Sequence, residues 1–315
     1  MINENQEIYA IEEEIQEYID FLNDVDSVGD LVLTSKKVDQ HFEECGRALN
    51  ELLVYPDIFL DICTPMNSRF KLFFYQRIIL RSMSRYRQTY VVATRAASKS
   101  FLAFASRFLA SMCIPNHHSF VCANLKKQAQ AIAEEKMQDD LWVKFPIFAT
   151  EMSFKIVEPG KNRPRDAYRS GVDAVEYNFS HGGSFDVISI ESARGKRRNS
   201  GLIEEVLEHN GQDLNEKIIP LMNVNRRNMR GVMVPEEPHA AKIYITTAGY
   251  HDSFAYEKFI ETLCFTAIDP KHYMTISMSY KIPVLHGLID TQTIKEVIAS
   301  PSFDRDSFER EYESK

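Results

Sequence analysis

The spacing of hydrophobic residues along this chain changes most sharply within residues 90–112. Residues 90–93 form a continuous apolar run of the kind that makes a buried strand. From Phe101 to Met112 the apolar positions recur at intervals of three and four residues, which is the period of a helix with one buried face. Small and polar residues fill the stretch between them. The pattern therefore predicts a strand, a short loop and a helix in immediate succession.

The remaining apolar pattern extends this unit into an α/β fold. Strands are predicted at 119–124, 174–179, 184–190, 241–249 and 273–280, and helices at 57–66, 70–80, 126–145, 207–224, 253–267, 290–300 and 302–312. Strands that alternate with helices are typical of a mostly parallel sheet flanked by helices. Gly182 and Gly183 separate two of the strands, which predicts a β-hairpin insertion. Residues 155–170 are polar and predict a surface loop.

An acidic segment precedes this fold. Residues 5–53 carry apolar positions at helical spacing among many acids, which predicts two helices. We therefore divide the chain into an N-terminal helical segment, 1–53, and a larger α/β domain, 54–315.

Composition narrows the functional class. The chain of 315 residues is 44% hydrophobic and 26% charged, as in soluble globular proteins. It has neither an apolar run that spans a membrane nor a secretory signal, so we expect a soluble intracellular protein without membrane contact. Five scattered cysteines without a C-x-x-C pair favour reduced, buried thiols. A net charge of −8 restricts any nucleic-acid contact to a local patch or one shared among subunits.

The loop between the first strand and its helix has the character of a phosphate-binding loop. Unpaired N–H groups at a helix start attract phosphate. Lys99 would add a positive charge for the β- and γ-phosphates, and Ser100 a hydroxyl suited to Mg²⁺. Ala93 and Ser98 stand where the pattern G-x-x-x-x-G-K-S/T has glycine. On their own, these residues fit an ordinary strand-to-helix junction with a solvated lysine equally well.

Three further places along the chain, with five residues between them, have side chains suited to the same chemistry. Glu204 and Glu205 end a short apolar run, where the first acid would organise Mg²⁺ and the second would activate water. The alternative is a pair of glutamates at a solvated helix start. The amide of Gln76 can pair with the edge of adenine, although a single glutamine on a helix is also common at the surface. Thr246 and Thr247 end another strand, where a hydroxyl can reach a γ-phosphate.

In their order along the chain, these motifs resemble the ATPase domain of the large terminase subunit of tailed bacteriophages, the motor that packages viral DNA. The likeness covers about residue 54 to the C-terminus and depends on the order of short motifs. They are residues 75–77, Arg95 with Lys99, residues 193–195, 202–205, 246–249 and 308–312. Glycine-poor loops with an early arginine are common in that family. The resemblance implies a P-loop NTPase fold of the RecA/ASCE type, with ATP and Mg²⁺ as cofactors.

The resemblance also implies a role for each matching residue. Residues implied to bind nucleotide are Gln76, Thr94, Arg95, Ala96, Ala97, Ser98, Lys99, Ser100, Thr246 and Thr247. Ser100 and Glu204 would hold Mg²⁺, and Glu205 would activate water. Arg95 would stabilise transition-state charge or change partner with the nucleotide state. Arg194 is implied as an arginine finger that reaches a neighbouring subunit. Two other roles for Arg194 fit equally well. It could form a patch that binds the DNA backbone together with Arg197 and Arg198, or it could lie in a solvated loop.

The partners implied are double-stranded DNA, the portal protein, the small terminase subunit and further copies of the chain in a ring. The location implied is the host cytoplasm, with transient binding at the procapsid portal. Family members continue into a nuclease domain, and we expect no nuclease activity from this chain. The acidic segment would contact another packaging component or form a plain solvated helix pair.

Two other functions fit part of this pattern. A helicase-like translocase would need a second RecA-like half, which the residues after Thr247 do not readily supply. A nucleotide-binding ring component without turnover is the other, and Glu205 argues against it because a mere binder has no need of a second acid.

Overall fold

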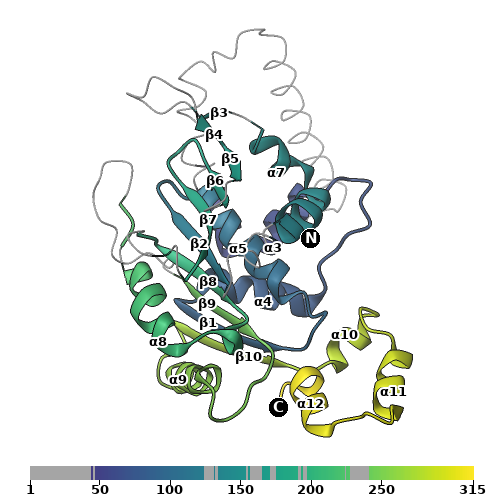
Figure 1. The fold of residues 1–315 in the computed structure, drawn as a ribbon. Coiled ribbons are helices and arrows are strands. Elements are labelled where there is room, and N and C mark those ends of the chain that lie inside the picture. Colours follow the sequence, from purple (N-terminus) through teal and green to yellow (C-terminus); the bar gives the residue numbers. More distant parts are fainter. Residues whose placement is uncertain are drawn as a thin grey trace, which may run out of the picture. The chain divides into compact units, whose positions relative to one another are not determined.

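A computed structural model gives the fold of the chain (Figure 1). It describes residues 44, 47–123, 131, 134–153, 155–156, 165–170, 175–190, 193, 197–223, 225–227 and 241–315. The chain divides into two compact units, Met1–Glu51 and Leu52–Lys315. In the first unit only residues 44 and 47–51 are described, and they are helical, so most of the acidic segment lies outside the described residues. The elements below belong to the second unit.

An eight-stranded sheet with the order β10-β1-β9-β8-β2-β7-β6-β5 runs through the second unit. Its strands are β1 (Gln88–Ala93), β2 (His118–Ala123), β5 (Tyr168–Ser170), β6 (Val175–Asn178), β7 (Ser184–Ser189), β8 (Ser200–Glu204), β9 (Lys242–Thr246) and β10 (Tyr273–Met278). Neighbours from β10 to β7 pair in parallel, whereas β6 pairs antiparallel with β7 and with β5. The mostly parallel sheet and its hairpin insertion are therefore confirmed.

Helices cover both faces of this sheet (Figure 1). The α-helices are α3 (Pro56–Cys63), α4 (Phe74–Arg85), α5 (Lys99–Cys113), α7 (Pro146–Glu151), α8 (Gly211–Asp213), α9 (Phe254–Ile268), α10 (Lys281–Leu285), α11 (Thr291–Ala299) and α12 (Arg305–Phe308). The π- and 3₁₀-helical segments are η1 (Glu134–Trp142), η2 (Val206–Glu208), η3 (Leu214–Ile218), η4 (Ile219–Asn223) and η5 (Glu309–Glu313). Within the described ranges, each helix is too short or too polar to cross a membrane.

β1 is buried along its whole length because both of its faces are covered. Val91 and Ala93 belong to the hydrophobic cluster that includes the buried face of α5. Tyr90 and Val92 belong to a second cluster, with residues of η3 and α9. Successive side chains of a strand point to opposite faces, so one apolar run contributes to two cores. This is why the run at 90–93 lacks a polar–apolar alternation.

The helix predicted at 207–224 is interrupted near its start and is not a regular α-helix. η2 is separate, and α8, η3 and η4 then follow one another without a gap from Gly211 to Asn223, in α-, π- and 3₁₀-helical geometry. Extended backbone at His209 ends η2, and the side chain of Asn210 accepts hydrogen bonds from Gln212 N and Asp213 N to start α8. Pro220, which has no N–H group to donate, lies within η4, where the helix has 3₁₀ geometry.

Other predicted boundaries shift for local reasons. The helix predicted from residue 70 begins at Phe74, because the Gln76 side chain accepts a hydrogen bond from Phe73 N and caps α4 there. The predicted loop at 155–170 contains β5 and the two-stranded pair β3 (Lys155–Ile156) and β4 (Arg165–Asp166). In the helix predicted at 126–145, residues 126–130 and 132–133 lie outside the described residues, and η1 is π-helical.

A buried carboxylate fixes α3 against α4, the helix that carries Gln76. Asp57 accepts hydrogen bonds from Arg81 at 2.7 and 2.8 Å and from Arg77 at 3.2 Å, and its side chain is fully buried. Burial alone would raise the pKa of Asp57, but the hydrogen bonds from Arg81 and Arg77 outweigh it and hold the pKa below the ordinary value of 3.8. Its negative charge therefore stabilises the fold above that pH.

We predict that Asp57→Asn lowers the free energy of unfolding at pH 7 by about 2 kcal/mol, a value reduced from that of a fully buried pair because both arginines are partly exposed. The wild type loses this contribution as the pH falls through the lowered pKa of Asp57. Urea unfolding of the wild type and of Asp57→Asn should therefore show a difference in unfolding free energy at pH 7 that becomes smaller at pH 3. Asp61→Asn, at a half-exposed partner of Arg77, is the matched control and should change the free energy of unfolding little. If Asp57→Asn lowered the free energy of unfolding equally at both pH values, the prediction would be contradicted.

Candidate functional site

Most of the predicted site residues lie at one edge of the sheet. Because β1, β9 and β8 are adjacent and parallel, their carboxyl ends reach the same edge. Thr94 follows β1, Thr246 ends β9 and Glu204 ends β8. Residues separated by more than a hundred positions in the sequence are therefore neighbours in space.

The loop between β1 and α5 takes a shape that usually requires glycine. Ala96 and Ser98 have φ values of 62° and 59°, in the left-handed region that L-residues rarely adopt. α5 then begins at Lys99, and no side chain caps its first turn. Free N–H groups and the positive end of the helix dipole are thus presented at the loop, which is the arrangement that binds anions.

A cavity of about 280 Å³ lies over this loop. Thr94 and residues 96–101 form one wall, Phe70 and Gln76 contribute beside them, and Lys136, Asp140 and Lys144 line it as well. The volume is near the lower end of the range for small-ligand sites. The loop, the start of α5 and the η1 region therefore enclose a space of suitable size for phosphate groups.

Lys99, Ser100, Glu204 and Glu205 come together beside this cavity. The side chain of Lys99 is mostly buried, and its Nζ lies 3.6 Å from Glu205 Oε1. The Ser100 hydroxyl hydrogen-bonds the carboxylate of Glu204. The spacing of these residues in the sequence does not by itself require them to lie close together. The order of the strands in the sheet brings them to the same place.

The carboxylate of Glu204 lies in surroundings that disfavour its negative charge. Burial raises its pKa to about 7, and the nearby charge of Glu205 acts in the same direction, while Ser100, Lys99 and Lys136 oppose them. Its Oε2 atom is buried and has no hydrogen-bond partner. A buried oxygen of this kind is costly unless something binds it.

This donor set fits a magnesium ion. Mg²⁺ prefers oxygen ligands and is commonly held by one or two protein groups together with substrate phosphates and water. The Oε2 atom of Glu204 and the hydroxyl of Ser100 are such ligands. Among the described residues no group of three or more His, Cys, Asp or Glu side chains is placed to hold a metal, so the phosphates would have to complete the site.

His209 is a neighbour of the site that the sequence reasoning missed. Its ring is buried, and Nε2 donates a hydrogen bond of 2.8 Å to the backbone oxygen of Glu204. The next residue, Glu205, has a strained left-handed backbone with φ of 46°. The imidazole therefore supports the backbone just before this strained residue, and no motif pattern in the sequence marks it.

Arg95 does not line the cavity but contacts the C-terminal segment. Its side chain is 80% exposed, and its Nε donates a hydrogen bond of 2.9 Å to Glu311 Oε2. The hydroxyl of Thr94 donates a 2.8 Å hydrogen bond to the backbone oxygen of Glu311. The loop between β1 and α5 is thus bonded to η5 through two adjacent residues.

Gln76 is buried, not solvent-exposed, and both ends of its amide have partners in the chain. Oε1 accepts a hydrogen bond of 2.9 Å from Phe73 N, and Nε2 donates one of 3.1 Å to Ser98 Oγ. In this arrangement Gln76 connects the start of α4 to the loop. Oε1 and Nε2 can each form one further hydrogen bond, so these contacts hold the amide in place and leave it able to pair with adenine.

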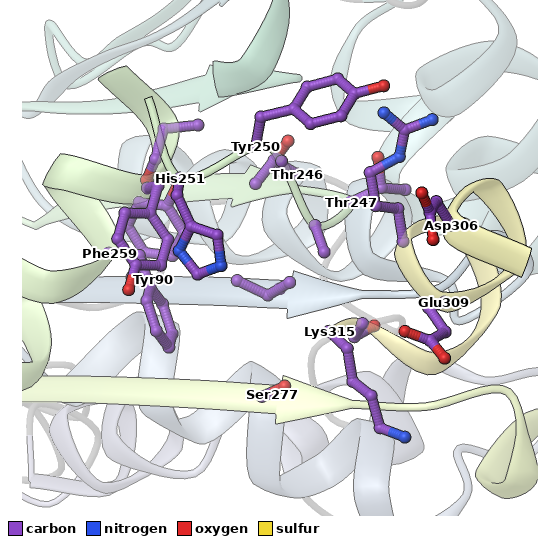
Figure 2. Close-up of a pocket in the computed structure, with 17 residues that line it drawn as sticks. Tyr90, Thr246, Thr247, Tyr250, His251, Phe259, Ser277, Asp306, Glu309 and Lys315 are labelled. Atoms are coloured by element: carbon purple, nitrogen blue, oxygen red, sulfur yellow. Dashed lines mark hydrogen bonds between the residues drawn. The ribbon is translucent and has the colours of Figure 1, made fainter. Parts of the chain in front are cut away.

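Thr246 and Thr247 lie on a different cavity, of about 560 Å³, on the α9 side of the sheet. Figure 2 shows them with Tyr250 across from Asp306 of the C-terminal segment. Thr246 Oγ1 accepts a hydrogen bond of 3.4 Å from Leu207 N, which connects β9 to η2. Neither threonine lines the cavity over the loop, so the structure places them at the same edge of the sheet as the other predicted residues but on a different cavity.

The predicted arginine cluster is only partly described. Arg194 lies outside the described residues. Arg198 forms an ion pair with Asp186, so its guanidinium has a partner inside the domain. Burial lowers the pKa of Arg198. Arg197 is exposed.

We predict that the hydrogen bond between Gln76 and Ser98 couples α4 to the loop by about 1 kcal/mol. A double-mutant cycle of Gln76→Ala, Ser98→Ala and the combined variant isolates this bond, because the cap on Phe73 N is lost in both backgrounds that lack Gln76. The measurement is the free energy of unfolding in urea for the four proteins. Strictly additive losses would show that the two side chains do not interact.

Solved structures share this fold, although no protein-family model matches the chain and no curated protein matches it either. The large terminase of bacteriophage HK97 aligns with a TM-score of 0.57 at 12% identity over 84% of this chain and 55% of that one. A mutant of the large terminase ATPase domain of Thermus phage P74-26 aligns with a TM-score of 0.50 at 13% identity over 78% of this chain and 94% of that one. The chain thus spans about half of a whole large terminase and has the fold of its ATPase domain.

Proposed function

We propose that this chain is an ATPase motor domain of the large-terminase type, which hydrolyses ATP with Mg²⁺ to move double-stranded DNA into a capsid. One observation carries the proposal: Lys99, Ser100, Glu204 and Glu205 converge beside a loop cavity at the carboxyl edge of a parallel sheet. A cation, a hydroxyl, a metal-binding carboxylate and a second carboxylate are the groups that this reaction needs.

The chain's own groups divide the work of binding. The N-terminal end of α5 and the ammonium group of Lys99 would hold the β- and γ-phosphates. Ser100 and Glu204 would hold Mg²⁺, which when bound neutralises charge on the phosphate oxygens. Binding would favour the ionised form of Glu204, because its unpartnered oxygen then has a positively charged neighbour.

Glu205 would accept the proton of the attacking water. Its side chain is 31% exposed, so water can reach it, and in the structure its charge is balanced by Lys99 at 3.6 Å. When phosphate oxygens take over Lys99, the carboxylate of Glu205 would be released from this ion pair and could bind the attacking water. The base would therefore be activated by the arrival of the substrate.

The remaining parts of the proposal concern the assembled motor. Arg194 would stabilise transition-state charge in a neighbouring subunit of a ring, and Arg95 would exchange Glu311 for phosphate. Portal protein and small terminase subunit are the proposed partners, at the procapsid portal in the host cytoplasm.

We expect Lys99→Ala to weaken Mg·ATP binding about tenfold to a hundredfold, because a buried ammonium that would bond phosphate is removed. Calorimetric titration of the nucleotide is the measurement. Lys295→Ala, which removes an exposed lysine on α11, is the matched control and should bind as the wild type does. Equal binding by Lys99→Ala and wild type would remove the loop from the proposed site.

Glu205→Gln should keep nucleotide binding and lower the rate of ATP hydrolysis by about 10²–10⁴, the usual contribution of a general base. Turnover is measured across protein concentration, since a site shared between subunits is more active when they assemble. Glu208→Gln, at an exposed glutamate on η2, is the control and should retain the wild-type rate. Hydrolysis by Glu205→Gln at the wild-type rate would exclude Glu205 as the base.

A further inference from the structure

The cavity over the loop has a second wall that the phosphate-loop pattern does not include. Lys136 and Asp140 of η1 and Lys144 just beyond it line this wall. Together with Lys99, the cavity is lined by three lysines and one aspartate, so its charged lining is positive in excess. A site that binds several phosphate groups needs such an excess.

Lys136 remains a cation close to the catalytic carboxylates. Its Nζ donates a hydrogen bond to Glu135 Oε1 and lies 3.6 Å from Asp140 Oδ2. Burial acts to lower the pKa of Lys136, but the carboxylates of Glu135, Asp140 and Glu204 outweigh it and raise the pKa. The charges of Lys136 and Glu204 act on one another, so the ammonium and this carboxylate lie within electrostatic range.

The contacts that hold Lys136 are weaker than those of its neighbour. Asp140 binds Lys144 Nζ at 2.6 Å but Lys136 at 3.6 Å, and the Nζ of Lys144 also lies 5.1 Å from the ring centroid of Phe101. The other partner of Lys136, Glu135, has a side chain that is 64% exposed, and ion pairs with exposed groups contribute little. Lys144 is therefore fixed, while Lys136 can leave its partners at small cost.

We propose that Lys136 is a second phosphate-binding cation of this site, which contacts the terminal phosphate of bound ATP from η1; this rests on the proposed function. Lys99 approaches from the loop, whereas Lys136 approaches from η1 on the side of Glu204. Metal-binding carboxylates of this kind lie beside the β- and γ-phosphates. ADP lacks the group that Lys136 contacts, so Lys136 distinguishes the substrate from the product.

The test compares Mg·ATP with Mg·ADP binding in the Glu205→Gln background, where ATP is not consumed. Lys136→Gln removes the charge but keeps a polar side chain, and it should weaken ATP binding about tenfold with less than about a twofold change for ADP. Lys136→Arg should restore most of the ATP affinity. Thermal unfolding of each variant checks that the fold is retained.

Lys144→Gln is the matched control, because it removes one positive charge from the same wall without the proposed contact. It should weaken ATP and ADP binding by similar factors, each smaller than the loss of ATP affinity in Lys136→Gln, because it changes only the electrostatic potential of the cavity. Equal losses of ATP and ADP affinity in Lys136→Gln, or no loss, would overturn the inference while leaving the proposed function in place. If the parent protein binds neither nucleotide, the proposed function fails and this inference fails with it.

Discussion

The site depends on the carboxyl ends of β1 and β8 lying at the same edge of the sheet, although these two strands do not pair with each other. β9 lies between β1 and β8 and pairs in parallel with both. Its register places Val92 of β1 opposite Thr246, and Glu204 of β8 opposite Ile245. The loop after β1 and the two glutamates after β8 therefore reach the same edge. Backbone hydrogen bonds along three strands, and not attraction between the site residues, set the distance between the lysine and the carboxylates.

Charge burial at this edge costs free energy that the rest of the fold must supply. Glu204 is buried with one oxygen unpartnered, and Glu205 has a strained backbone. Strain and unsatisfied polar atoms of this kind persist only where the surrounding structure enforces them, and they concentrate at functional sites. The well-packed cores on both faces of β1 provide that enforcement. Lys99 and Ser100 offset part of the cost by pairing with the two glutamates.

The elements that are decided by local pattern were predictable. The run at 90–93, the helix after it and the Gly182–Gly183 hairpin followed from period and turn chemistry. The interruption near the start of the helix predicted at 207–224 could also have been predicted, since Asn210 is a residue type that caps helices. Other features depend on contacts distant in sequence. No local signal shows that Gln76 bonds Ser98 or that Lys136 lines the loop cavity.

The C-terminal segment connects the two cavities and limits how either can change. Glu311 bonds Thr94 and Arg95 of the loop, and the adjacent Arg310 lies 4.1 Å from the ring centroid of Tyr250, beside the second cavity. Because the two residues are consecutive on η5, a displacement of one displaces the other. A ligand that draws the loop away from η5 must therefore break the hydrogen bonds to Glu311 or move η5 with the loop. Movement of η5 would displace Arg310 and so reach Tyr250, which follows β9.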